Sequence, residues 1–138
     1  MEHIFEEKVY YADTDAYGVV WHGTYLRWLE KGRVLFCEKL GLNLSELTKN
    51  DIALPVATIN VKYKASARLD DEIVISTKVT KKTPLAITFT QTITDKNSGK
   101  VFIVAEIVIV AISNAGKLYR RLPEVITNAF NEDIVCNA

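Results

Sequence analysis

The stretch YYADTDAYGVVWHGTYLRWLEKGR, residues 10–33, decides how the rest of the chain is interpreted. Two acids, Asp13 and Asp15, follow an apolar run, Gly18 breaks the chain, and His22 stands where a helical pattern begins. Few structural roles need this mixture of residue types in so short a segment. We therefore expect the functional chemistry to lie where this loop meets the start of the helix.

The segment after the loop has the pattern of one long helix. From about Gly23 large side chains recur every three or four residues, and Gly41 supplies a C-terminal stop. Gly32 lowers helix propensity by up to about 1 kcal/mol relative to alanine, which predicts a close approach to a neighbouring backbone. Trp28 and Leu35 add apolar bulk beside the main stripe, so we expect a sheet curved around the helix. The stripe itself contains Leu26, Leu29, Arg33, Phe36 and Leu40.

The remaining segments alternate with a period of two, as half-buried strands do. The first, roughly Ile4 to Tyr11, precedes the loop. The apolar run from Val101 to Ile112 predicts a central strand with both faces covered. Other predicted strands are Ile59 to Tyr63, Ile73 to Val79, Ile87 to Thr94 and, more briefly, Leu118 to Leu122. Leu42 to Ala53 reads as a turn or short helix, and Pro123 as the opening of a last helical turn through Phe130.

This order predicts an α+β fold in a single domain spanning residues 1–138. We expect an antiparallel curled sheet of five to six strands wrapped around one long helix. Such a sheet has edges, and pairing between copies would hide them, so a homodimer or homotetramer is expected.

Composition excludes several classes of protein. Seventeen basic residues balance seventeen acidic ones, so no broad positive field exists to attract nucleic acid. No apolar run approaches the length of a membrane span, and no membrane insertion is expected. Cys37 and Cys136 show neither metal spacing nor a disulfide framework, and the N-terminus does not read as a secretory signal. These features predict a cytoplasmic protein.

The loop and the helix start suggest acyl chemistry. Backbone N–H groups near His22 would polarise a carbonyl oxygen, and Asp15, seven residues earlier, could attack that carbonyl or activate water. Alternatively, Asp13 and Asp15 simply end a strand and cap the helix. We expect no metal ion, because no HxH, HxxxH or cysteine spacing accompanies these residues. Serine-hydrolase and nucleotide-phosphate motifs are absent from the sequence.

The segment DTDAYGVVWHGTY, residues 13–25, followed by Glu30 and Arg33, resembles the signature of hotdog-fold acyl-CoA thioesterases of the 4-hydroxybenzoyl-CoA thioesterase type. The resemblance includes the subgroup associated with the Tol-Pal system. It extends more loosely to residues 54–56, 67–71 and 122–124.

The resemblance implies roles for individual residues. Asp15 would be the catalytic nucleophile or general base, the backbone N–H at His22 would polarise the thioester carbonyl, and the side chains of His22 and Tyr25 would also be catalytic. Where the family usually has asparagine, two residues after the histidine, this chain has Thr24, so the resemblance does not define how water is positioned here. The implied substrate-binding residues are Tyr17, Gly18, Val20, Gly23, Glu30, Lys81, Lys82 and Thr83.

Two of these assignments have simpler alternatives. Glu30 lies about 12 Å along the helix from His22, a suitable depth for the far end of an acyl group, yet it could merely pair with Arg33 or Arg27. The two lysines suit the phosphates of coenzyme A in a loop at Lys81 to Thr83, but that loop could merely be solvated.

The sequence therefore predicts a thioesterase that hydrolyses an aliphatic or aromatic acyl-CoA to the free acid and coenzyme A. No metal or other cofactor is expected, since coenzyme A is part of the substrate. The alternatives are a thioesterase acting on acyl carrier protein or dihydroxynaphthoyl-CoA, or a non-catalytic acyl-CoA binding protein. A hydratase or dehydratase is disfavoured, because the acid precedes the histidine within one loop.

Overall fold

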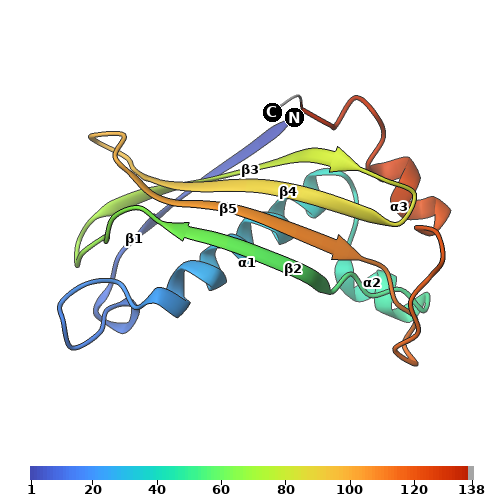
Figure 1. Cartoon of the computed structure of the whole chain (residues 1–138), viewed down its shortest axis with the longest axis horizontal. Coiled ribbons are helices and arrows are strands. Elements are labelled where there is room, and N and C mark those ends of the chain that lie inside the picture. Colours follow the sequence, from blue (N-terminus) through green and yellow to red (C-terminus); the bar gives the residue numbers. More distant parts are fainter. Residues whose placement is uncertain (137–138) are drawn as a thin grey trace.

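A five-stranded antiparallel sheet curls around one long helix (Figure 1). The computed structural model describes residues 1–136. This arrangement confirms the predicted α+β fold, with the smaller of the two expected strand numbers. In the sheet order β1-β3-β4-β5-β2, the strands are β1 (Glu2–Lys8), β3 (Glu72–Lys82), β4 (Ala86–Asp95), β5 (Val101–Val110) and β2 (Val56–Tyr63). The helices are α1 (His22–Lys39), α2 (Leu44–Lys49) and α3 (Glu124–Ala129).

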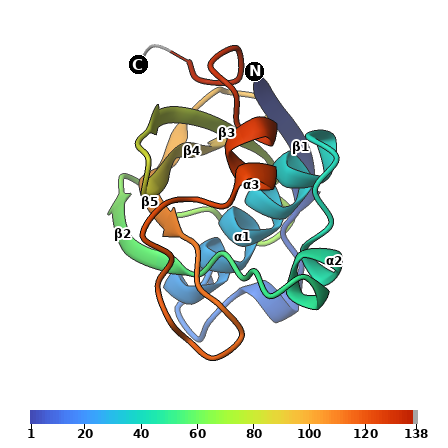
Figure 2. The ribbon, with the colours of Figure 1, turned by 90° about the vertical axis from the view of Figure 1, so that its right-hand side faces the viewer.

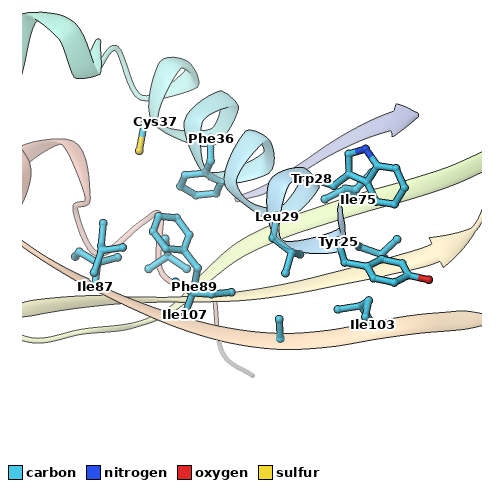
Figure 3. Packing of buried hydrophobic residues seen from close by; sticks show 14 of the residues in the cluster. Tyr25, Trp28, Leu29, Phe36, Cys37, Ile75, Ile87, Phe89, Ile103 and Ile107 are labelled. Atoms are coloured by element: carbon cyan, nitrogen blue, oxygen red, sulfur yellow. The ribbon is translucent and has the colours of Figure 1, made fainter. Parts of the chain in front are cut away.

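Helix α1 lies in the concave side of the sheet, as the end-on view in Figure 2 shows. Phe36 of α1 packs edge-on against Phe89 of β4 with ring centroids 5.6 Å apart, and stacks with Phe130 at 6.3 Å. Towards the start of the helix, Tyr25 meets Trp28 edge-on at 5.7 Å. Figure 3 shows Tyr25, Leu29 and Phe36 pointing from α1 towards the strands, on which Phe89 and Ile107 lie. Burial of each such side chain contributes about 1.5–3 kcal/mol.

The inward face of α1 is rotated relative to the predicted stripe. Leu29 and Phe36 are fully buried as expected, but the placement of Leu26 was wrong, since it is 37% exposed. The reason is that the larger rings of Tyr25 and Trp28 occupy the inward positions.

Gly32 brings α1 close to the sheet, which confirms the predicted close approach. A Cβ at this position would lie 2.6 Å from Thr77 Oγ1 and 2.9 Å from Gln91 Nε2. The neighbours are therefore side chains of β3 and β4, not the backbone that the sequence suggested.

Several predicted boundaries were wrong because pairing partners were not visible in the sequence. The first strand ends at Lys8, since residues 11–13 form a 3-10 turn. Lys81 and Lys82 belong to β3 and pair with β4 after a bulge, so they do not lie in a loop. Leu118 makes only a single bridge to Ile112. The short helices α2 and α3 lie where helical turns were predicted.

The apolar run in β5 is fully covered along one face, and on the other only Phe102 is buried. Ile103, Ala105, Ile107 and Ile109 are buried against the core, whereas Glu106 on the other face is exposed. The prediction of two covered faces was therefore wrong for the single chain, because α1 packs on the concave side alone.

The edge strand β2 carries apolar side chains on the inner face of the sheet that no other part of residues 1–136 covers fully. Val56, Ile59 and Tyr63 pair with the buried residues Ile109, Ile107 and Ile103 of β5, so they share the inner face of the sheet. They are nevertheless 43%, 47% and 49% exposed. We call these three residues the β2 inner strip. None of the helices among residues 1–136 combines the length and apolarity that a membrane crossing needs.

Candidate active site

The acidic loop before α1 is a short, well-bonded hairpin. Thr14 and Val20 form a bridge, and Asp15 N donates to Val19 O at 2.9 Å. Gly18 N donates back to Asp15 O at 3.0 Å, and Gly18 has φ +77°, a conformation that favours glycine. The hairpin therefore fixes the backbone on both sides of the predicted catalytic acid.

The carboxylate of Asp15 is held inside this hairpin. Its Oδ1 accepts the Tyr17 backbone N–H at 2.8 Å, and the residue is half-buried. Its charge also reaches Tyr25. Burial raises the pKa of the Tyr25 hydroxyl, the Ala67 N–H partly opposes this rise, and Tyr63, Asp71 and Asp15 add to it. The acid is therefore partly shielded from solvent, with one oxygen fixed by its own hairpin.

The start of α1 has no side-chain cap. Trp21 is the N-cap residue and contributes no capping bond. Asp13 instead accepts the Tyr10 N–H with its carboxylate at 2.9 Å, while its carbonyl oxygen accepts Trp21 N at 2.9 Å and Thr24 Oγ1 at 3.2 Å. Within residues 1–136 neither acid hydrogen-bonds to the N–H groups of His22 and Gly23, so the capping alternative does not hold for α1.

Trp21 lies across the first turn of the helix. A Cβ on Gly23 would collide with the Trp21 ring, so glycine allows this packing. The Trp21 ring centroid is 4.9 Å from that of His22, and both side chains are exposed. Tyr63 of β2 donates to the His22 carbonyl oxygen at 3.0 Å, which fixes the end of β2 beside the helix start.

Tyr25 joins the helix to the loop before β3. Its hydroxyl is buried and accepts the Ala67 N–H at 2.9 Å. The Ala67 carbonyl oxygen accepts Val20 N at 2.9 Å, so one residue connects both the hairpin and the helix. Sequence reasoning missed Ala67, Tyr63 and Trp21 as parts of this site. Tyr63 had one available signal, its inward phase in the alternation of β2.

The predicted substrate-binding residues occupy different surroundings. Tyr17, at the tip of the hairpin, is 88% exposed, whereas the Val20 side chain is buried in the core. Glu30 is exposed on α1 and lines a pocket of about 340 Å³.

Lys81, Lys82 and Thr83 lie at the other end of the sheet from the acidic hairpin (Figure 1). Lys82 Nζ donates to Thr127 O at 3.1 Å, and Thr83 Oγ1 accepts Ala86 N at 3.0 Å. Lys82 and Thr83 border a cavity of about 560 Å³ that also contacts Arg121. The length of β3 alone separates the two ends by roughly 33 Å at about 3.3 Å per residue. One chain therefore does not bring these residues to Asp15.

No three His, Cys, Asp or Glu side chains gather within residues 1–136 in a way that could hold a metal ion.

Comparison with known proteins gives consistent results. A family model described as the thioesterase-like superfamily matches residues 9–130. The acyl-CoA thioester hydrolase YbgC of Escherichia coli is 32% identical over 125 residues, covering 91% of this chain and 92% of the relative.

Two solved structures share the arrangement of the chain. A DHNA-CoA thioesterase from Staphylococcus aureus has a TM-score of 0.80 and 29% identity, over 86% of this chain and 80% of that one. Slr0204, a 1,4-dihydroxy-2-naphthoyl-CoA thioesterase from Synechocystis, has a TM-score of 0.85 over 96% of this chain and 98% of that one. At 23% identity this second likeness concerns the fold alone.

Proposed function

The chain belongs to the thioesterase-like superfamily, and on that premise we propose that it hydrolyses the thioester of an acyl-CoA to the free acid and coenzyme A. The hotdog fold implied by the sequence resemblance is confirmed by the structural neighbours. The observation that carries the proposal is a half-buried carboxylate, Asp15, in a rigid hairpin beside the uncapped start of α1.

The proposed reaction uses the two parts of this site separately. The N–H groups of His22 and Gly23 bind the thioester carbonyl oxygen as it becomes negative, each donor contributing roughly 3 to 4 kcal/mol. Asp15 either attacks the carbonyl carbon or removes a proton from the attacking water.

If Asp15 attacks, the C–S bond breaks to leave an anhydride between Asp15 and the acyl group, which water then hydrolyses to the free acid. If Asp15 activates water, the C–S bond of the water adduct breaks and the acid forms directly. In both routes the coenzyme A thiolate leaves and takes up a proton, from solvent or, in the second route, from the protonated Asp15. Tyr25, which the resemblance also implies to be catalytic, supports the site by fixing the start of α1 through its buried bond to the Ala67 N–H.

The proposed active unit is a homodimer or homotetramer with sites between subunits. The uncovered β2 inner strip supports this assembly, because apolar side chains on an edge strand favour a covering partner. The distance between Asp15 and Lys82 also supports it. A second copy could bring its Lys81, Lys82 and Thr83 to the coenzyme A phosphates of a substrate held at Asp15. The free thiols of Cys37 and Cys136 fit the proposed cytoplasmic location.

The test is Asp15→Asn assayed by thiol release over a panel of acyl-CoA thioesters. We expect the variant to keep its fold and lose most turnover. Asp13→Asn is the matched control, since the Asp13 carboxylate caps the 3-10 turn instead. Near wild-type turnover by Asp15→Asn would refute the role of Asp15.

A second candidate is a thioesterase for dihydroxynaphthoyl-CoA, favoured by the 29% identity to the S. aureus enzyme. Competition between that thioester, acyl-CoA and acyl carrier protein thioesters separates these substrate classes. Tight binding of every thioester without thiol release would instead identify a non-catalytic binding protein.

A further inference from the structure

A pocket of about 340 Å³ opens between α1 and the segment that leads into β2. Most of its wall is apolar and includes Leu54, Val56 and Ile109. Cys37 of α1 and Phe89 of β4, both visible in Figure 3, also line it. Its two charged wall residues are Glu30 and Arg33.

Arg33 is held in a fixed orientation by a buried amide. Gln91 is fully buried, and its Nε2 donates to Leu29 O at 2.9 Å and to Thr77 Oγ1 at 2.8 Å. This leaves the Gln91 carbonyl oxygen to accept from Arg33 Nη1 at 3.0 Å. The guanidinium is therefore positioned by a neutral group.

The charge of Arg33 is not neutralised by a close acid. No carboxylate within residues 1–136 approaches it to 4.0 Å, and only one of its five N–H donors is used. Burial lowers the pKa of Arg33, and the charge of Glu30 opposes this effect without forming an ion pair. The partly buried guanidinium stays protonated, and its remaining donors are reached by solvent, so they are available to an acceptor that enters the pocket.

The position of Arg33 relates the pocket to the proposed thioester site. It lies 11 residues after His22, which is about 16 Å along a helix, and helical side chains lean back towards the N-terminus. Building on the proposed function, we infer that this pocket receives the far end of the acyl group and that Arg33 selects acyl groups ending in a carboxylate.

The chemistry of the wall supports this substrate class. The apolar residues suit the methylene chain, and the planar guanidinium fork suits a carboxylate bound through two parallel hydrogen bonds. Glu30, on the same wall, repels the terminal carboxylate of the acyl group and so weakens the preference that Arg33 creates for it.

The experiment compares kcat/KM for pairs of thioesters of equal chain length, one from a dicarboxylic acid and one from the plain fatty acid. The ratio is kcat/KM for the dicarboxylic thioester divided by kcat/KM for the plain fatty-acid thioester. Charge-assisted hydrogen bonds of this kind predict that Arg33→Met lowers this ratio by about tenfold or more. Arg33→Lys should fall between wild type and Arg33→Met, because it keeps the charge but loses the fork. Glu30→Gln should raise the ratio. Arg27→Met, a matched change at an exposed position on the same helix, should leave the ratio unchanged.

Each outcome decides the inference. An unchanged ratio in Arg33→Met overturns the inference. It is also overturned if wild type hydrolyses the dicarboxylic thioester equally well after its terminal carboxylate has been converted to an uncharged methyl ester. If Arg33→Met does not fold, the opposite shifts expected for Arg33→Lys and Glu30→Gln carry the test.

If wild type hydrolyses neither of these two thioesters but does hydrolyse another acyl-CoA of the panel, the inference is overturned and the proposed function stands. If it hydrolyses no acyl-CoA, the proposed function fails, and the ratio of the two dissociation constants then tests Arg33 by itself. In that binding experiment, an equal ratio of dissociation constants in wild type and Arg33→Lys would overturn the inference.

Discussion

The hydroxyl oxygen of Tyr25 accepts the backbone N–H of Ala67 at 2.9 Å, although the two residues are 42 positions apart in the chain. Tyr25 is 2% exposed and Ala67 is fully buried, so water cannot replace either partner. This one bond fixes the first turn of α1 to the loop before β3, at the place where the catalytic carboxylate is proposed to act.

Tyr25→Phe should therefore destabilise the protein by about 1–3 kcal/mol, because it leaves a buried N–H without an acceptor. Urea unfolding measures this loss. Tyr63→Phe is the matched control, since it removes an exposed hydroxyl that donates to His22 O, and it should cost about 1 kcal/mol or less. Equal losses in the two variants would contradict the importance of burial here.

Gly32→Ala should destabilise the fold even though alanine favours helix. The added methyl group would meet Thr77 Oγ1 and Gln91 Nε2 inside a packed layer, which costs about 1–3 kcal/mol against a propensity gain of about 1 kcal/mol. Thermal or urea unfolding gives the difference. Glu38→Ala, at an exposed position on α1, should stay within about 0.5 kcal/mol of wild type. A more stable Gly32→Ala variant would show that the layer has room to spare.

The two thiols should differ strongly in reactivity. Burial raises the pKa of the Cys37 thiol to about 11, with Arg33 partly opposing the rise, whereas Cys136 is only half-buried. At mildly alkaline pH, a disulfide reagent should modify Cys136 quickly and Cys37 only on unfolding. Cys136→Ser should abolish the fast reaction, and Cys37→Ser should keep it. A fast reaction in Cys136→Ser would mean that the helix–sheet layer opens readily.

Stability should fall in mild acid because of His3. Burial lowers the pKa of its imidazole below the ordinary value of 6.5, the charge of Lys39 adds to this, and its buried Nδ1 has no hydrogen-bond partner within residues 1–136. The unfolded chain then binds the proton more strongly than the folded one. The contribution of His3 is complete above pH 6.5 and is lost as the pH falls below it.

The measurement for His3 is the free energy of unfolding above and below pH 6.5 in wild type and His3→Gln. The variant should lose less stability on acidification than wild type. His22→Gln, at an exposed position, provides the comparison. Identical pH profiles for wild type and His3→Gln would remove His3 as the cause.

The sequence predicted best what depends on nearby residues. Helix α1 was visible because its period is local and because Gly41, with φ +81°, ends it. The Asp15 hairpin and the helix start were visible for the same reason. The ends of β3 depend on pairing with β4, so Lys81 and Lys82 were misplaced.

Contacts across long separations in the chain were not predictable. Tyr63 reaches the His22 carbonyl oxygen from 41 residues away, and no period or motif encodes that bond. The inward face of α1 was misjudged at Leu26 because helix period alone does not say which of two apolar edges the sheet will cover.

The side chain of Gln91 hydrogen-bonds to both the backbone of α1 and the guanidinium of Arg33. Through Leu29 O and Thr77 Oγ1 it fastens the middle of α1 to the sheet, and through Arg33 it orients the cation of the pocket. A motion that lifts the middle of α1 off the sheet therefore disturbs both the bond to Leu29 O and the bond that orients Arg33. The packing of the helix and the orientation of the cation should be lost together, in one cooperative step.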